Sequence, residues 1–337
     1  MRAANYFIFI LIFFLACKSG FAGETRTFID ARGREIQLSL PVRKVVVLSA
    51  NALEVMQILQ AENLVVGVSD YIHQKPRLWS KFQDRPVVGR WNEPDYELIA
   101  TLRPDLVLCY GRFPGLEAEQ KLEPLGIQVL RLDFYKISAL PREVQILGMV
   151  LGKQKQAEVF LQWHAQKMEH IEKLRRKNSP GPKVYVESFS DYQVMGPGSG
   201  GYELSIYAGA RNIASAFSTS FSRVSPEWVL SKNPDVIVKI ASIKDAYVCD
   251  NSKKFRKIQK NIMERPGWKF TRAVQEGKVY VLASDVAGGP RAAVGIAYMT
   301  KWFFPKVDLN PQEMHREYLA DFLKVPYRGF YAYPTGK

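Results

Sequence analysis

Short apolar runs alternate with amphipathic segments through the first half of the chain. Continuous apolar runs are typical of strands buried on both faces of a parallel sheet, and the segments between them carry apolar residues at helical spacing. The predicted strands are Lys44–Ser49, Leu64–Val68, Leu106–Tyr110 and Gln128–Leu132, and the predicted helices are Ala52–Gln60, Tyr96–Leu102 and Gly115–Leu125. This order predicts a parallel sheet with right-handed crossovers, preceded by a β-hairpin over Thr27–Leu38.

The same alternation returns in the second half. The predicted strands there are Lys183–Glu187, Val236–Ile240 and Val279–Leu282, and the predicted helices are Glu203–Ala208 and Ala292–Phe303. Residues 311–334 are expected to pack as a helix followed by a tail. The chain therefore contains two α/β segments of similar design.

Between the two halves, residues 154–176 place apolar side chains on one stripe at helical spacing. A helix of this length extends for about 35 Å, enough to run along two lobes. The sequence thus predicts an α/β fold of two Rossmann-like lobes with parallel sheets, joined by a single long connector helix. The expected boundaries are 23–152 for the N-terminal lobe, 153–178 for the connector and 179–337 for the C-terminal lobe and tail.

One sequence template occurs once in each predicted lobe. Glu97 stands seven residues before Pro104-Asp105, and Glu227 stands seven residues before Pro234-Asp235, with an apolar strand following in both cases. A short amphipathic helix closed by proline and leading into a buried strand is half of a βαβ unit. Its recurrence supports two related lobes, and paired lobes usually bind a ligand between them.

The first 22 residues have a different character. The run from Tyr6 to Ala16 is apolar but short for a membrane span, and Gly20 and Ala22 are small residues before Gly23. This pattern predicts a secretory signal peptide over residues 1–22 and a periplasmic or other extracytoplasmic location. Cys17 leaves a second interpretation, a lipid anchor on a processed N-terminus, and an uncleaved anchor is a third.

Composition narrows the choice of protein class. Hydrophobic residues make up 47% of the 337 positions and charged residues 24%, so the chain can bury two ordinary cores and is not disordered. Without Arg2 and Lys18 the formal charge falls from +14 to +12, which fits anionic ligands or anionic surfaces. Cys109 and Cys249 lie in different lobes and are predicted to be free thiols.

A series of short motifs occurs in a fixed order over most of residues 25–334. The motifs are Pro41–Ser49, Val65–Ser69, Glu97–Val107, Gly209–Ile213, Val224–Glu227 and Gly289–Arg291. Each motif is weak by itself, but in order and spacing the series resembles the substrate-binding proteins of ABC importers for iron-siderophore chelates and cobalamin, the class with two lobes joined by a long helix.

The resemblance implies a protein that captures a metal chelate between its lobes and delivers it to the permease subunits of an ABC importer. It implies no reaction, no cofactor and no nucleic-acid partner, and we expect a monomer. In such proteins a glutamate on each lobe meets arginines of the permease, and Glu97 and Glu227 occupy the matching positions. The alternative is that each glutamate only stabilises the start of its own helix.

Ligands of α/β sheets bind at the carboxyl ends of the strands, and the loops there are rich in aromatic and arginine side chains. This combination suits a bulky, partly conjugated, anionic chelate. For each aromatic residue the alternative is core packing, and for each arginine it is a structural ion pair. The predicted ligand-binding residues are Arg90, Trp91, Tyr110, Arg112, Phe189, Tyr192, Arg223 and Arg291.

Direct metal ligation by the protein depends on the chelate. Tyr71, Tyr110 and Tyr192 could bind ferric iron if the ligand is haem or an unsaturated iron complex, whereas a saturated chelate needs no protein ligand. The four histidines show no metal-binding spacing, and no metal site is predicted. A ferric siderophore is the first candidate, and corrinoid, haem and molybdate are the alternatives.

Two other protein classes compete with this interpretation. A secreted hydrolase would need an activated nucleophile, but no histidine stands in a suitable motif, and Gly196–Gly201 lacks the Gly-Lys-Ser/Thr ending of a phosphate-binding loop. A polyanion-binding surface protein would need a contiguous basic face. The basic runs Lys173–Lys177 and Lys253–Lys257 are short and separated in sequence.

Overall fold

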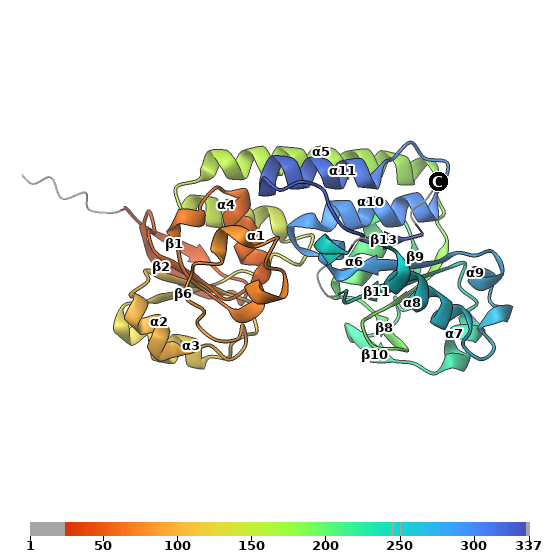
Figure 1. The fold of residues 1–337 in the computed structure, drawn as a ribbon, viewed down its shortest axis with the longest axis horizontal. Helices are drawn as coiled ribbons and strands as arrows, with labels where there is room; N and C mark the ends of the chain where they lie inside the picture. Colours follow the sequence, from red (N-terminus) through yellow and green to blue (C-terminus); the bar gives the residue numbers. More distant parts are fainter. Residues whose placement is uncertain (1–23, 244–245, 250, 335–337) are drawn as a thin grey trace, which may run out of the picture.

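The computed structural model describes residues 24–243, 246–249 and 251–334. The predicted signal peptide and Cys17 lie outside these residues. Two α/β lobes lie side by side, and the long helix α5 (Gln154–Lys177) runs across the top of both (Figure 1). The predicted architecture of two lobes and one long connector helix is confirmed.

The N-terminal lobe is built on a four-stranded sheet in which every pairing is parallel. The strand order is β4 (Val65–Val68), β3 (Val45–Val47), β5 (Leu106–Cys109), β6 (Gln128–Arg131). Its helices are α1 (Ala50–Ile58), α2 (Tyr96–Leu102), α3 (Glu117–Leu122) and α4 (Leu140–Val150). The predicted hairpin is also present, as antiparallel strands β1 (Glu24–Ile29) and β2 (Glu35–Leu40).

The C-terminal lobe has a sheet with a parallel centre and antiparallel edges. The central strands β7 (Lys183–Glu187), β11 (Val236–Ala241) and β12 (Val279–Ala283) are parallel, and the short strand β9 (Arg211–Asn212) pairs parallel with β7. The edges are formed by β8 (Gln193–Met195), β10 (Phe221–Arg223) and β13 (Ala332–Tyr333).

The parallel centre of this sheet was predicted, but its antiparallel edges were not. The loop between β7 and β8 spans only residues 188–192, and so short a connection can join antiparallel strands but not parallel ones. At the other edge, the tail of the chain returns as β13, antiparallel to β12, with Val281 opposite Tyr333. The prediction of a helix followed by a tail missed this last strand.

The helices of the C-terminal lobe surround this sheet. They are α6 (Gly200–Tyr207), α7 (Pro226–Lys232), α8 (Lys253–Met263), α9 (Arg272–Gln275), α10 (Ala292–Phe303) and α11 (Pro311–Tyr318). Helix α11 is tied to the connector because Glu317 accepts hydrogen bonds from the Trp163 indole, at 2.7 Å, and from Lys167, at 2.6 Å. The middle of the connector is thereby fixed to the second lobe.

The two lobes share one hydrophobic core. Buried side chains form a continuous cluster from Val55 of α1, through Phe160 of α5, to Leu323 of the π-helical turn that follows α11. Separating the lobes at this junction would expose apolar surface to water, so the structure opposes large hinge movements. Within the described part of the chain, no helix has both the length and the apolar character needed to cross a bilayer.

The repeated Pro-Asp motif forms the same structure in both lobes. In the N-terminal lobe, the Asp105 N–H donates to the Lys44 carbonyl at 2.9 Å, and the Lys44 N–H donates to the Asp105 carboxylate at 2.8 Å. In the C-terminal lobe, Asp235 and Lys183 make the same pair of bonds, both at 2.8 Å. Each aspartate therefore joins the starts of two neighbouring parallel strands.

The helix before each aspartate is also the same in both lobes. Asp95 caps α2 by accepting the Leu98 N–H at 2.9 Å, and Ser225 caps α7 by accepting the Trp228 N–H at 3.2 Å. Both helices end at a residue in the left-handed region, Arg103 or Asn233. The sequence template thus encodes a cap, a seven-residue helix, a left-handed stop and a strand.

Candidate functional site

Aromatic side chains gather at the carboxyl ends of the N-terminal strands. The rings of Trp91 and Tyr110 are 5.7 Å apart, those of Trp91 and Phe113 are 5.3 Å apart, and both pairs meet edge to face. Tyr135, which follows β6, lies 6.4 Å from Tyr110. Three loops that are distant in sequence thus supply one aromatic cluster, formed by Trp91, Tyr110, Phe113 and Tyr135. The sequence identified Trp91 and Tyr110, but it missed Phe113.

The cluster is open to solvent at one end. Trp91 is 36% exposed and Phe113 is 48% exposed, which is unusual for large aromatic rings that pack on one another. Tyr110 lies deeper, and burial raises the pKa of its phenol to about 12. At neutral pH Tyr110 therefore carries its proton and acts as a neutral hydrogen-bonding group in the absence of a metal.

Two predicted arginines flank this cluster. Arg90 is exposed, with only a long contact of 3.4 Å to Glu93, and Arg112 is exposed and makes no ion pair among the described residues. Arg112 also lies close enough to Tyr135 to oppose the rise that burial causes in the pKa of that phenol. The N-terminal lobe therefore offers exposed rings with exposed guanidinium groups beside them, a combination that suits an anionic chelate.

A buried ion pair fixes the loop that carries Tyr110 and Phe113. Arg131, at the end of β6, is fully buried and bonds Glu119 with two nitrogens at 2.6 and 2.7 Å. Its remaining donors bond the carbonyls of Tyr110, Pro114 and Gly115 at 2.8 to 3.0 Å. The aromatic cluster is therefore mounted on a loop whose backbone is held in place by a charged side chain.

The C-terminal lobe fixes the corresponding loop with the opposite charge. Glu187, fully buried at the end of β7, accepts both Arg265 nitrogens at 2.8 and 2.9 Å and Lys239 at 2.8 Å. It also accepts the Tyr185 hydroxyl and the Tyr192 backbone N–H. Lys239 and Arg265 continue to Asp191, and these cations hold the pKa of the Glu187 carboxyl below its usual range in spite of its burial.

The predicted ligand residues on this lobe have different surroundings. Phe189 is 56% exposed directly after β7, and Arg223 is exposed on the edge strand β10, so both are available to a ligand. Tyr192, the third residue predicted here to bind ligand, packs within the lobe, which was the stated alternative for the aromatic residues. The Arg265 guanidinium lies 4.4 Å from its ring centroid and the Trp268 ring is 5.9 Å away, so its main contacts are structural.

Arg291 requires a clear correction. It was predicted to bind ligand, but its side chain is buried and bonds Glu54 of the other lobe at 2.7 and 2.8 Å. The Tyr318 hydroxyl donates to the same carboxylate. Arg291 is therefore part of the lobe junction, because its guanidinium supplies the positive charge that neutralises the buried Glu54 carboxylate.

A second ion pair across the lobes was not predicted. Lys75, in the loop after β4, bonds Asp285, in the loop after β12, and both side chains are buried. Since both loops follow the carboxyl ends of parallel strands, the two sheets direct these ends toward the same junction. Tyr71 lies beside this pair, with the Lys75 ammonium 5.6 Å from its ring centroid. The only sequence signal for this ion pair was the position of Lys75 in the loop after a predicted strand. Its partner Asp285 is 210 residues away in the sequence.

The glycine-rich loop Gly196–Gly201 has a structural role. Ser199 caps α6 by accepting the Tyr202 N–H at 3.2 Å, so the helix begins at Gly200, three residues before the predicted start. Glu203, in the first turn, accepts the Ile137 N–H of the other lobe at 2.8 Å. The loop therefore leads into a helix whose first turn helps to join the lobes.

Glu97 and Glu227 occupy equivalent places. Each is the second residue of its helix, α2 or α7, and each is exposed. The pKa of the Glu227 carboxyl is lowered by hydrogen bonds from the Glu227 backbone N–H and the Ser225 hydroxyl, as expected at a helix start. Both helices lie at the lower edge of the molecule in Figure 1, one on each lobe.

Other sequence predictions about individual side chains can be checked directly. Cys109 and Cys249 are both free, as predicted. Among the described residues, no group of three or more histidine, cysteine or carboxylate side chains could bind a metal ion.

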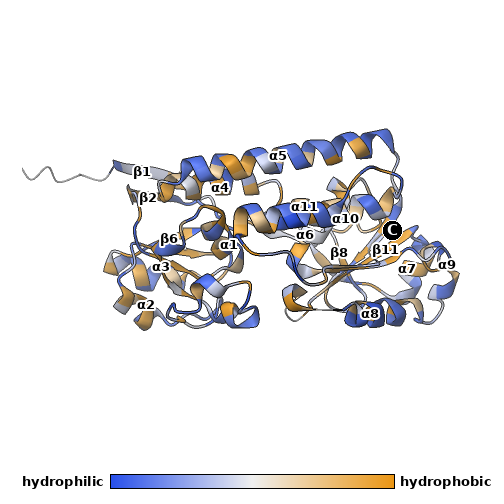
Figure 2. Cartoon of the chain, turned by 45° about the horizontal axis from the view of Figure 1, so that its top comes forward, coloured by the Kyte–Doolittle hydropathy of each residue, from blue (hydrophilic) through white to orange (hydrophobic). Residues whose placement is uncertain are grey.

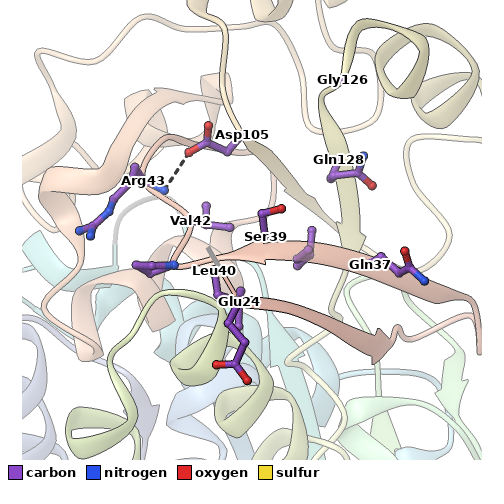
Figure 3. A pocket seen from close by; sticks show the side chains of 11 residues that line it. Glu24, Gln37, Ser39, Leu40, Val42, Arg43, Asp105, Gly126 and Gln128 are labelled. Carbon is purple, nitrogen blue, oxygen red and sulfur yellow. Dashed lines mark hydrogen bonds between the residues drawn. The ribbon is translucent and has the colours of Figure 1, made fainter. Parts of the chain in front are cut away.

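A hollow of about 970 Å³ lies at the opposite edge of the N-terminal sheet, where Arg43, Asp105 and Gln128 mark the starts of strands (Figure 3). That edge is not where α/β sheets bind ligands.

The sequence of this chain is similar to that of a known protein family and of individual proteins. The sequence model of a family described as periplasmic binding protein matches residues 45–286, more than half of the chain. The high-affinity heme uptake system protein IsdE of Staphylococcus aureus MRSA252 is 23% identical over 206 residues, covering 60% of this chain and 68% of the relative.

Two solved structures share the fold. The TroA-like periplasmic binding protein FepB from Veillonella parvula has a TM-score of 0.77 at 22% identity, covering 91% of this chain and 98% of its own. The molybdate periplasmic binding protein MolA of Haemophilus influenzae, bound to molybdate, has a TM-score of 0.73 at 20% identity, covering 90% of this chain and 100% of its own. At these identities the likeness shows the fold alone.

Proposed function

The chain belongs to the periplasmic binding protein family, and from this premise we propose that it captures a metal chelate, with a ferric siderophore as the first candidate, and delivers it to an ABC importer. The observation that carries this proposal is the exposed aromatic cluster of Trp91, Tyr110, Phe113 and Tyr135 beside the free guanidinium of Arg112. Rings and arginines together recognise large anionic ligands by stacking and charge.

The C-terminal lobe would complete the site with Phe189 and Arg223, which are exposed at the corresponding side of its sheet. The shared core and the ion pairs across the lobes support binding with little change in shape. In a preorganised site of this kind, ordering of the side chains costs little free energy when the ligand binds. We assign no reaction to the chain.

Haem is the second candidate, because a relative named for heme uptake matches 60% of the chain. In that case Tyr110 or Tyr71 would supply the phenolate that binds iron. Since burial raises the pKa of Tyr110 to about 12, iron would have to displace a firmly held proton there. Corrinoid and molybdate are the remaining alternatives for the same fold.

Delivery requires a partner in the membrane. We propose that Glu97 and Glu227 contact arginines of the permease, one from each lobe, because they occupy equivalent exposed positions at matching helix starts. We further propose that a signal peptide ends at Ala22, with a lipid anchor at Cys17 as the alternative, and that the protein acts as a monomer. Family membership implies that the protein acts outside the cytoplasm.

The test is a titration of the purified protein with ferric siderophores of several chemistries, cobalamin, haem and molybdate. Tryptophan fluorescence, corrected for ligand absorption, and calorimetry follow binding. We expect one ligand class to bind with submicromolar affinity. Arg112→Ala should weaken binding, whereas Trp91→Phe should remove part of the fluorescence change.

Arg43→Ala is the matched control, because Arg43 lies at the opposite edge of the same sheet and uses only its backbone N–H there. Equal losses for Arg112→Ala and Arg43→Ala would contradict the proposed site. Absence of binding to every ligand in both measurements would contradict capture of a metal chelate.

A further inference from the structure

The positive charge of this protein is confined to part of the molecule. Residues 24–152 contain 16 lysine and arginine residues and 16 acidic ones, so the N-terminal lobe is neutral. Residues 179–337 contain 22 lysine and arginine residues against 14 acidic ones. The largest local excess is on α8, where five basic residues and no acidic residue occur between positions 253 and 260. The proposed ligand site on the N-terminal lobe does not use this charge.

Helix α8 presents these charges outward. Phe255 and Ile262 are buried and anchor the helix against β12 and β13, which leaves the basic side chains on its outer face. Lys253, Lys254, Arg256, Lys257 and Lys260 are all exposed. Figure 2 shows α8 as a mainly hydrophilic helix at the lower edge of the second lobe.

Few of these cations are neutralised. In the part of the chain that the structure describes, Lys253, Lys254 and Lys257 form no ion pair, and Lys260 reaches Glu264 only at 3.6 Å. Lys253 and Lys254 also occupy the first turn, where positive charge is unfavourable for the helix and where α8 has no acidic residue. The stability of α8 therefore does not explain why these lysines are present.

An exposed aromatic side chain extends the basic face. Phe270, in the 3-10 turn η6 (Trp268–Phe270) that packs against α8, is 68% exposed, and the Lys269 ammonium lies 5.1 Å from its ring centroid. This turn also adjoins α7, because Arg272 just after it donates its backbone N–H to the Asn233 side chain at the end of α7. The basic face is thus continuous with the helix that carries Glu227.

We propose that the exposed side of α8 and η6, formed by Lys253, Lys254, Arg256, Lys257, Lys260, Lys269 and Phe270, is a docking surface for an anionic phospholipid bilayer. Clustered lysines bind the negative surface potential of such a bilayer, and an exposed aromatic ring inserts at the headgroup boundary. A convex helix face with one ring suits a flat, deformable surface better than the groove that nucleic-acid strands require. This inference does not depend on which chelate the protein binds.

Docking of this kind has a consequence for delivery. Because η6 and α9 adjoin α7, a second lobe resting on the bilayer through α8 brings α7 close to the plane of the membrane. The neutral N-terminal lobe has no equivalent attachment. The membrane would therefore orient the protein through one lobe before any contact with a permease.

The experiment is sedimentation of the exported, processed protein with vesicles of phosphatidylcholine containing 0 or 40% phosphatidylglycerol, after mass spectrometry has confirmed that it carries no acyl chain. We expect binding only to the anionic vesicles, and weaker binding as salt rises. The variant with Lys253→Glu, Lys254→Glu and Lys257→Glu should lose about tenfold or more in vesicle affinity. Phe270→Ser should weaken binding less and leave its salt dependence unchanged.

The matched control reverses three exposed charges at the end of the connector, with Lys173→Glu, Arg176→Glu and Lys177→Glu, and so changes the net charge by the same amount. An equal loss of binding in both triple variants would overturn the proposal, because net charge alone would then explain the affinity. Binding to pure phosphatidylcholine, or complete displacement from anionic vesicles by duplex DNA at equal phosphate concentration, would also overturn it. Circular dichroism confirms that each variant is folded.

Discussion

The two lobes share a backbone design but differ in the chemistry of their loops. The Pro-Asp motif makes equivalent hydrogen bonds in both lobes, where Asp105 and Asp235 each join the starts of two neighbouring strands. At the opposite end of the sheets, Arg131 fixes the loop in one lobe and Glu187 fixes it in the other. The amino ends of the strands thus preserve the fold, whereas the carboxyl ends have diverged.

The aromatic rings show the same difference. Trp91 and Phe113 are exposed in the N-terminal lobe, whereas Tyr192 in the C-terminal lobe packs beneath Arg265. We infer that the first lobe makes most of the contact with the ligand and that the second lobe contributes fewer side chains. The surplus positive charge of the second lobe lies elsewhere, on α8.

Removal of Glu187 should have the largest effect. Glu187→Ala leaves Lys239 and Arg265 buried with only Asp191 as a partner, and we expect the free energy of unfolding to fall by about 3–5 kcal/mol. Denaturant unfolding measures this loss. The conservative control is Glu187→Gln, which keeps the volume but not the charge. A loss below 1 kcal/mol in the Ala variant would show that the charge network does not support the second lobe.

The next largest effect is expected at low pH, where the connector and the C-terminal lobe should lose stability before the N-terminal lobe. Burial lowers the pKa of His164 on the connector to about 4, and burial also lowers the pKa of His315 in the C-terminal lobe. Both histidines are thus neutral when folded and take up protons more readily when unfolded. The contribution of each histidine to stability is complete above the unfolded pKa of about 6.5 and is lost as the pH falls through its lowered folded pKa, which is about 4 for His164.

For His164 this loss amounts to about 3 kcal/mol at most, at about 1.4 kcal/mol for each pKa unit. Hydrogen exchange at pH 7 and pH 5 should show protection decreasing first in the connector and the C-terminal lobe, because His73, the histidine of the N-terminal lobe, is exposed. His164→Phe should reduce the effect. Equal loss of protection in both lobes would contradict this difference.

The two Pro-Asp motifs should contribute similar amounts to the free energy of unfolding. Asp105→Ala removes charge-assisted hydrogen bonds to the backbone N–H groups of Arg43 and Lys44, and Asp235→Ala removes one to the Lys183 N–H and one to the Arg272 guanidinium. We expect each substitution to cost about 1.5–3 kcal/mol of unfolding free energy. Thermal and denaturant unfolding of the two variants give the comparison. A difference of more than about twofold would mean that the repeat is structural in one lobe only.

The smallest effect on stability is expected at the two exposed glutamates. Glu97→Gln and Glu227→Gln each remove a favourable charge at a helix start, and because both side chains are exposed we expect only a small change in the free energy of unfolding. If both glutamates contact a permease, the double variant should nevertheless lose stimulation of the importer's ATPase while keeping its affinity for the ligand. Normal stimulation would leave only their local role in the helices.

The sequence was sufficient for most of the fold because the relevant signals are local. Apolar runs and helical spacing placed the strands and helices, and the spacing of the Pro-Asp motifs revealed the two lobes. The antiparallel edges of the second sheet were not predicted, because strands as short as β8 and β13 carry no periodicity of their own. Their pairing depends on the chain returning to an existing sheet.

The site was only partly determined by the sequence. The order of the strands sufficed to place Trp91 and Tyr110 at one edge, since parallel strands bring their carboxyl ends together. Only the tertiary structure could decide that Arg291 pairs with Glu54, that Lys75 pairs with Asp285 and that Arg265 covers Tyr192. These partners are 73 to 237 residues apart. For the two ion pairs across the lobes, the burial that makes pairing necessary exists only after the lobes have packed together, whereas Arg265 meets Tyr192 only when the C-terminal lobe itself has folded.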